Sequence, residues 1–301
     1  MSTRRSAELC DSAPGLSRRH ALGRLAGGLA AGAVASLAMA RAQIRPPALT
    51  GRVVRSTDRA YDAARFDFNR RFDVRPLAIV YPKDTGDVGN AVRWARAHGV
   101  PLSVRSGGHS YEAFSLGPGL VIDVSAMHAV TLDPPRHTIT AQSGVRLLDL
   151  YRWLWNEGVA VSGGTCASVG LGGLTVGGGV GYLSRMWGLT ADNVIRFEVV
   201  DAEGRALEAS PRHNPDLFWA LRGGGASFGI VTEITVRVQP IGSVVVVHLE
   251  WPFEQAAAVL SAWQQHQVSW PDELSFTLEL GGTPAGTLAG EAAIERAPIA
   301  P

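Results

Sequence analysis

The chain has 301 residues, of which 46% are hydrophobic, 7% aromatic and 18% charged, and this excludes collagen-like, disordered and disulfide-scaffold proteins. The length allows one large domain or two of ordinary size, with ample apolar residues for a buried core. Residues 43–301 hold 22 Lys and Arg against 25 Asp and Glu, a net charge of −3, which gives no general case for a nucleic-acid partner.

The first 42 residues have the pattern of a twin-arginine export signal. Arg18 and Arg19 precede an uncharged run over 25–40, and small-residue cleavage sites follow at 38–42. The run is mostly Ala and Gly and is shorter than the roughly 20 apolar residues that span a bilayer, so no permanent membrane anchor is expected. The sequence therefore predicts export by the twin-arginine machinery, to the periplasm or outside the cell, with a mature chain that begins near Gln43.

Helical and strand patterns alternate along the next part of the chain. The N-terminal segment 43–74 has no clean period, and no element is predicted there. Strands are predicted at 77–81, 102–104, 120–124, 138–141, 194–200, 206–207 and 229–239, the fifth and sixth forming a hairpin, with helices at 84–98, 146–156 and 214–222. These elements place one domain over residues 75–240.

Residues 241–301 read as the beginning of another domain. The pattern predicts a strand at 244–250, a helix at 253–266 and a strand at 274–280, and residues 281–301 show no periodic core signal. One helix and two strands cannot enclose a core. We therefore expect a partial domain, whose two strands lack partner strands and favour aggregation.

Several kinds of chemistry find no support. The only lysine, Lys83, follows proline, so no Walker loop exists, and neither a Gly-x-Gly-x-x-Gly fingerprint nor histidines at metal-ligand spacing occur. The segment 225–229 matches the nucleophile elbow of serine hydrolases around Ser227. That elbow needs a strand before the serine and a helix after it, and here the predicted order is the reverse.

Two glycine-rich loops each present one nucleophilic side chain. Arg105 to Ser110 contains two glycines beside His109, and Cys166 follows Gly163 and Gly164. Consecutive glycines let backbone amides converge on an anion such as a pyrophosphate, although an ordinary turn would have the same local sequence. Cys166 is the only cysteine after the signal, so it is buried and inert, reactive, or covalently occupied.

Five motifs, in matching order and spacing, resemble the FAD domain of berberine bridge enzyme-like oxidases, a group of the vanillyl-alcohol oxidase or PCMH-type flavoprotein superfamily. They lie at 105–110, 164–170, 172–181, 185–194 and 219–231. The resemblance covers about residues 75–240. It implies an α+β fold: a PCMH-type FAD-binding domain of two α/β subdomains, followed by the start of an antiparallel-sheet substrate domain at 241–301.

The resemblance also implies an FAD that is bound by two covalent bonds. His109 stands where the family's histidine bonds the 8α-methyl group, and Cys166 stands where its cysteine bonds ring carbon 6. Tyr111 matches a position that faces substrate or oxygen, with a packed aromatic as the alternative. The resemblance implies no metal. The other cofactor-binding positions that the resemblance implies are Arg105, Ser106, Gly107, Gly108, Ser110, Val169, Gly170, Gly173, Gly179, Asn193, Ile230 and Val231.

The activity that the resemblance implies is oxidation of an alcohol or sugar carbon by hydride transfer to FAD, with dioxygen as acceptor. A dehydrogenase that uses another acceptor is one alternative. Family members continue past residue 301 and supply their catalytic base from that later part, so the base is expected outside this chain. A truncated, inactive flavin-binding fragment is therefore the other alternative. Leu174 stands where plant members often have histidine, inside an intact glycine frame.

Overall fold

The computed structural model describes residues 47–280 and 287–295. The chain divides into two units, Met1–Arg45 and Pro46–Pro301, and the described residues all belong to the second. The predicted signal over residues 1–42 lies outside the described part. Within that part, no helix combines the length and apolar character needed to cross a membrane.

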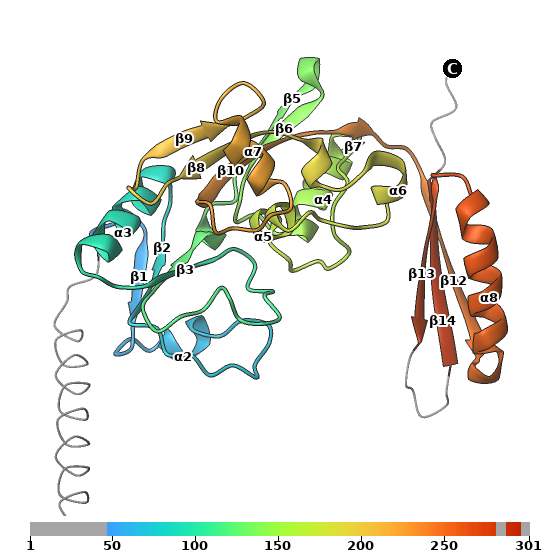
Figure 1. Cartoon of the computed structure of the whole chain (residues 1–301), viewed down its shortest axis with the longest axis horizontal. Helices are drawn as coiled ribbons and strands as arrows, with labels where there is room; N and C mark the ends of the chain where they lie inside the picture. The colour runs from blue at the N-terminus through green and yellow to red at the C-terminus, as the bar shows by residue number, and fades with distance from the viewer. Residues whose placement is uncertain (1–46, 281–286, 296–301) are drawn as a thin grey trace, which may run out of the picture. The chain divides into compact units, whose positions relative to one another are not determined.

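The first sheet has the strand order β1-β2-β4-β3 (Figure 1). The strands β2 (Ala78–Tyr81), β4 (Leu120–Asp123) and β3 (Leu102–Arg105) run parallel and confirm three predicted strands. The strand β1 (Arg52–Arg55) pairs antiparallel with β2, and a short helix α2 (Tyr61–Ala64) follows it. The N-terminal segment therefore belongs to this sheet, and the boundary expected at residue 75 does not separate it from the domain.

The helix α3 (Thr85–Ala97) confirms the helix predicted at 84–98. The Asp84 carboxylate caps it by accepting a hydrogen bond from the Asp87 amide at 2.8 Å. Its apolar face is buried through Val88, Ala91, Val92 and Ala95. A Cβ on Gly89 would come within 2.6 Å of the Gly204 carbonyl oxygen, so only glycine lets α3 pack this closely on the turn that contains Gly204.

The second sheet is antiparallel throughout, with the order β5-β6-β10-β8-β9. Its strands are β5 (Val130–Asp133), β6 (Thr138–Gln142), β10 (Ile230–Arg237), β8 (Val194–Val200) and β9 (Ala206–Ala209). The predicted strands and the β8–β9 hairpin are confirmed. No strand was predicted at β5, a four-residue edge strand with no fully buried residue.

Several helices accompany this sheet. The predicted helices appear as α4 (Leu147–Asn156) and α7 (Pro215–Leu221). Two short helices that were not predicted, α5 (Leu171–Val176) and α6 (Ser184–Trp187), interrupt the glycine-rich stretch, and β7 (Val159–Ala160) pairs with β11 (Gln239–Pro240). The core includes Leu150, Leu154, Phe197, Leu221 and Ile234, each at most 1% exposed. Up to residue 240 the fold is thus α+β, as expected, with two larger sheets and the two-stranded β7–β11 pair.

The C-terminal segment forms a three-stranded antiparallel sheet and a helix. The strand β12 (Val244–Pro252), the helix α8 (Ala256–His266) and the strand β13 (Leu274–Leu280) match the prediction. A third strand, β14 (Thr287–Glu295), lies between β12 and β13 and pairs with both. The expectation that the two strands lack partners was therefore wrong. The β14 sequence is rich in Ala and Gly, which are poor strand formers, so its pattern did not reveal it.

Candidate functional site

The two predicted loops meet backbone to backbone. A Cβ on Gly107 would lie 2.1 Å from the Gly170 amide nitrogen, and a Cβ on Gly170 would lie 2.4 Å from the Gly107 nitrogen. The carbonyl oxygen of Ser143 joins them further, because it accepts hydrogen bonds from the Ser106 hydroxyl at 2.7 Å and from the Gly172 amide at 2.8 Å. The glycines at 107 and 170 are therefore required by contact between the loops.

His109 is held from two sides. Its Nε2 lies 2.9 Å from the Ser168 hydroxyl, which is on the other loop. The Phe68 ring stacks on the imidazole with 4.8 Å between the ring centroids and 14° between the planes. Burial of the ring, together with the positive charge of Arg146, lowers the pKa of His109, and Asp67 opposes this shift. The imidazole is thus fixed in place and favoured in its neutral form.

Cys166 lies in a short turn with an exposed, free thiol. The Val169 amide donates to the Cys166 carbonyl at 3.2 Å and closes the turn. The carbonyls of Ala167 and Val169 accept hydrogen bonds from Leu148 and Leu147, each at 3.0 Å. This turn is therefore anchored on the first turn of α4, and the thiol is presented at the surface.

Arg105 has a different place from the one that its motif suggested. Its guanidinium is 5% exposed and forms ion pairs with Asp123, at 2.7 Å, and Asp67, at 3.2 Å. The same group donates to the carbonyls of Ala64, at 2.6 Å, and Phe66, at 3.4 Å. The side chain therefore secures the loop from inside the protein, and contact between this loop and the cofactor stays a prediction.

The remaining predicted cofactor positions fall into three groups. Gly173 is exposed, with no atom within 4 Å of an added Cβ, and so leaves open space. A second group is packed inside the protein. Gly179 has φ of +78° and abuts Thr190, the Asn193 amide donates to the Trp187 and Leu189 carbonyls, and Ile230 and Val231 are 6% and 8% exposed. The third group lies on the loops of His109 and Cys166. The Ser110 hydroxyl accepts a hydrogen bond from the Phe114 amide, Gly108 has φ of +70°, and Val169 is half-buried.

Tyr111 is 75% exposed, so its ring is not packed among the residues that the structure describes, and its role stays a prediction. The Asn69 side chain donates a hydrogen bond to the Tyr111 carbonyl oxygen at 2.8 Å and so holds the backbone of Tyr111. Tyr111 does not line the hollow described next, where another tyrosine stands.

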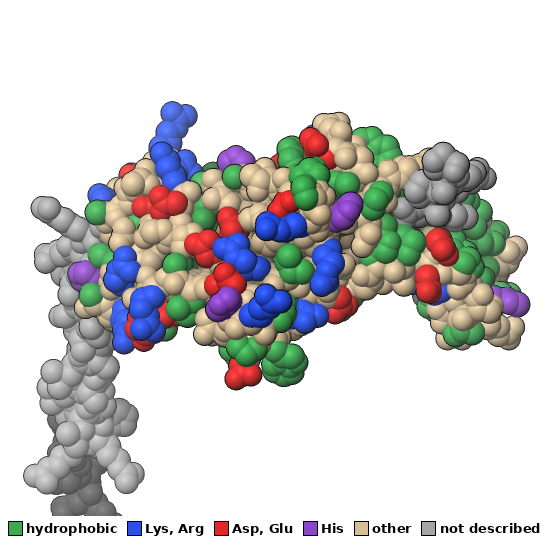
Figure 2. Space-filling view, turned by 90° about the horizontal axis from the view of Figure 1, so that it is seen from above, with side chains coloured by type: hydrophobic (Ala, Val, Ile, Leu, Met, Phe, Trp, Pro, Cys, Tyr) green, Lys and Arg blue, Asp and Glu red, His purple; other side chains and the backbone are tan. Residues whose placement is uncertain are grey.

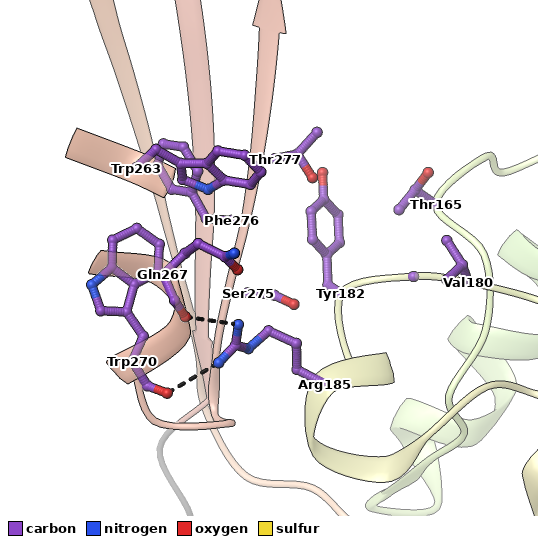
Figure 3. Close-up of a pocket in the computed structure, with 11 residues that line it drawn as sticks. Thr165, Val180, Tyr182, Arg185, Trp263, Gln267, Trp270, Ser275, Phe276 and Thr277 are labelled. Carbon is purple, nitrogen blue, oxygen red and sulfur yellow. Dashed lines mark hydrogen bonds between the residues drawn. The ribbon is translucent and has the colours of Figure 1, made fainter. Parts of the chain in front are cut away.

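A hollow of about 430 Å³ begins at Thr165, the residue before Cys166 (Figure 3). Arg185 reaches across it and donates to the carbonyls of Gln267, at 3.2 Å, and Trp270, at 3.0 Å. The Arg185 Nε is buried and has no hydrogen-bond partner among the described residues. The aromatic side chains on its lining are Tyr182, Trp263, Trp270 and Phe276.

Sequence reasoning did not assign these aromatic residues to a site. Tyr182 follows a run of glycines, and Trp263 and Trp270 lie in and after a predicted helix, where each reads as an ordinary core residue. Aromatic rings near polar groups are typical of small-molecule sites, but only the fold brings these segments together.

Charge does not favour a nucleic-acid surface on the face drawn in Figure 2, where basic and acidic side chains are intermixed. In the part of the chain that the structure covers, no three His, Cys, Asp or Glu side chains come close enough to hold a metal ion.

Comparison with known proteins gives consistent matches. The model of a family described as "FAD binding domain" matches residues 76–210. The chain is 39% identical over 237 residues to an uncharacterized FAD-linked oxidoreductase, YgaK, of Bacillus subtilis, covering 77% of this chain and 52% of that protein. It is 40% identical over 215 residues to the xylooligosaccharide oxidase of Thermothelomyces thermophilus, covering 69% and 42%.

Among solved structures, BBE-like 1 of Physcomitrella patens superposes with a TM-score of 0.76 at 33% identity, over 81% of this chain and 54% of that one. The chain spans about half the length of the relatives that it matches.

Proposed function

Because the chain belongs to the berberine bridge enzyme-like, PCMH-type family of FAD-linked oxidoreductases, we propose that its two loops carry FAD through covalent bonds to both His109 and Cys166. The observation that carries this proposal is the 2.9 Å contact between His109 and Ser168, because it joins the loop of the histidine to the loop of the cysteine. Cys166 is free and exposed, so a flavin ring can reach it, and a neutral imidazole has the lone pair that a bond to carbon needs.

The described residues fit a flavin nucleotide. Gly173 leaves open space beside the two loops, and at Gly223 and Gly225 the backbone has φ of +107° and +87°, with nothing within 4 Å of an added Cβ. A larger side chain at these positions would fill the space that a nucleotide needs. Arg105 supports the loop, and the cofactor is held by backbone and by the two attachment residues.

We further propose that the enzyme oxidises a sugar or another alcohol. When bound, FAD accepts the hydride, and dioxygen is the proposed final acceptor. In this proposal the protein orients the substrate: Trp263, Trp270 and Tyr182 offer aromatic faces to a sugar ring, and Arg185 holds the backbone of Gln267 and Trp270 at the hollow. The related xylooligosaccharide oxidase supports a carbohydrate as the substrate class.

Cofactor attachment is tested on the full chain by acid denaturation. Precipitated protein should keep the yellow colour. Either His109→Ala or Cys166→Ala should leave one bond, while the double variant should release FAD into the supernatant. Complete release from the unmodified, folded protein would contradict the proposal.

The electron acceptor is tested with xylooligosaccharides as the substrate. An oxidase should form hydrogen peroxide from dioxygen, whereas a dehydrogenase should reduce an added dye and form no peroxide.

Export through the twin-arginine machinery is proposed from the first 42 residues alone. Replacement of both Arg18 and Arg19 by lysine should retain the protein in the cytoplasm, because this pathway recognises the arginine pair. Fractionation of cells and N-terminal sequencing of the exported protein check this. The signal assignment is wrong if the double variant is still exported and the mature chain does not begin near Gln43.

A further inference from the structure

We propose that Ser168 is a positioning residue that determines which ring nitrogen of His109 is the nucleophile in flavin attachment. This inference rests on the proposed attachment of FAD through His109. Its geometric basis is the hydrogen bond between the Ser168 hydroxyl and His109 Nε2, 2.9 Å long, which is the one hydrogen bond of this imidazole in the described part of the chain.

The backbone that carries Ser168 is held by its surroundings. Ser168 lies within the turn closed by the hydrogen bond from Val169 to Cys166, and this turn is anchored on α4 through the neighbouring carbonyls. On the other side, Phe68 stacks on the imidazole and its amide donates to the Gly108 carbonyl at 2.8 Å. Phe68 thus restricts the plane of the imidazole, and Ser168 holds its Nε2 edge.

A neutral imidazole carries one N–H and one lone pair, on different nitrogens. When Nε2–H donates to the Ser168 hydroxyl, the lone pair is on Nδ1. Burial of His109 and the nearby charge of Arg146 favour the neutral ring, while Asp67 acts in the opposite direction. A hydroxyl both donates and accepts, so the 2.9 Å contact fits either tautomer; in the proposed arrangement Nε2–H donates to Ser168 and Nδ1 is the nitrogen that attacks carbon.

The attachment step balances as follows. One C–H bond of the 8α-methyl group and one imidazole N–H bond break, and a C–N bond forms between the methyl carbon and Nδ1. Two electrons and two protons are left on the flavin ring, one of these protons being taken from solvent in place of the imidazole proton, and dioxygen removes them to become hydrogen peroxide. The Nε2 proton is the one lost, and the Ser168 hydroxyl, as its acceptor, lies on its path to solvent.

The test isolates the histidyl bond in a Cys166→Ala background of the full chain. Apoprotein from riboflavin-limited cells receives FAD, and acid-stable flavin on the His109 peptide is followed over time by mass spectrometry. Ser168→Ala should slow the attachment about five- to tenfold, the effect of one lost hydrogen bond. Ser168→Thr, which keeps the hydroxyl, should restore the rate. Ser125→Ala, a serine in a separate turn, should match the background.

A second measurement does not depend on flavin. Nitrogen-15 chemical shifts of the His109 ring in apoprotein, assigned by their absence in His109→Ala, should report mainly the Nε2–H tautomer. Ser168→Ala should shift the ring toward a mixture of tautomers. Equal attachment rates with unchanged ring shifts would overturn the role of Ser168. A background protein that forms no histidyl bond at all would instead contradict the proposed function.

Discussion

The carboxylate of Asp87 accepts two hydrogen bonds from Thr50, one from the backbone amide at 2.9 Å and one from the hydroxyl at 2.8 Å. The amides of Gly51 and Lys83 also donate to it, each at 3.1 Å. Asp87 is on α3, so this one side chain fastens the residues before β1 to the turn after β2.

Replacement of Asp87 by asparagine should therefore destabilise the protein by about 1–3 kcal/mol, because partly buried donors lose a charged acceptor. Urea unfolding near neutral pH measures this. Asp84→Asn is the matched control, since asparagine also caps helices, and it should change stability by only a few tenths of a kcal/mol. Equal losses in the two variants would contradict the assigned role of Asp87.

The same carboxylate gives the stability a defined pH dependence. Burial acts to raise the pKa of Asp87, but the hydrogen bonds from Thr50, Lys83 and Gly51 together lower it below its ordinary value. This contribution should be full above the ordinary pKa of 3.8 and be lost as the pH falls through the lower pKa of the folded state. Unfolding measured from pH 5 downward should show a smaller dependence on pH in Asp87→Asn.

Arg105 should be far more important for stability than an exposed arginine in a similar pair. Arg105→Met leaves Asp67 and Asp123 buried without their cation and should cost about 3–5 kcal/mol. Arg136→Met is the control, because it breaks an exposed 2.8 Å pair with Asp133 and should cost less than about 1 kcal/mol. Chemical unfolding of both variants checks the difference, and similar costs would argue against a buried network.

Two glycines should separate packing from cofactor binding. Gly107→Ala should destabilise the apoprotein strongly, because its Cβ would collide with the Gly170 backbone. Gly173→Ala should leave the apoprotein unchanged or up to about 1 kcal/mol more stable, since the site is helical and open. The same variant should nevertheless retain less FAD. Unimpaired flavin retention in Gly173→Ala would show that the cofactor does not pass there.

The state of His109 should respond to Arg146. Burial is the main cause of its lowered pKa, and Arg146 adds to it, so Arg146→Gln should raise the pKa toward the ordinary value of 6.5. The rate at which diethyl pyrocarbonate modifies the His109 peptide, followed against pH, gives the midpoint. Arg152→Gln, an exposed change on α4, should leave that midpoint in place. A midpoint that is the same in both variants would contradict the electrostatic argument.

Local patterns predicted much of this fold and less of the site. The helix α3 was predictable because its buried residues recur at helical spacing and Asp84 caps it. The two loops that carry His109 and Cys166 were both visible as glycine runs. The support of Arg105 was not, since its partners Asp67 and Asp123 are 38 and 18 residues away and only the fold brings them together. The hydroxyl of Ser168 is likewise 59 residues from His109.

The arrangement of the C-terminal sheet determines when it can fold during synthesis. The strand β14 is the last of the three to leave the ribosome, yet it is the central one, and Val244 of β12 pairs with Glu295 of β14. Until residues 287–295 have emerged, β12 and β13 have no neighbouring strand to complete them, whereas both earlier sheets already have all their strands. Translation pauses just before this point would prolong the exposure of unpaired edges, and chaperone capture is expected to concentrate there.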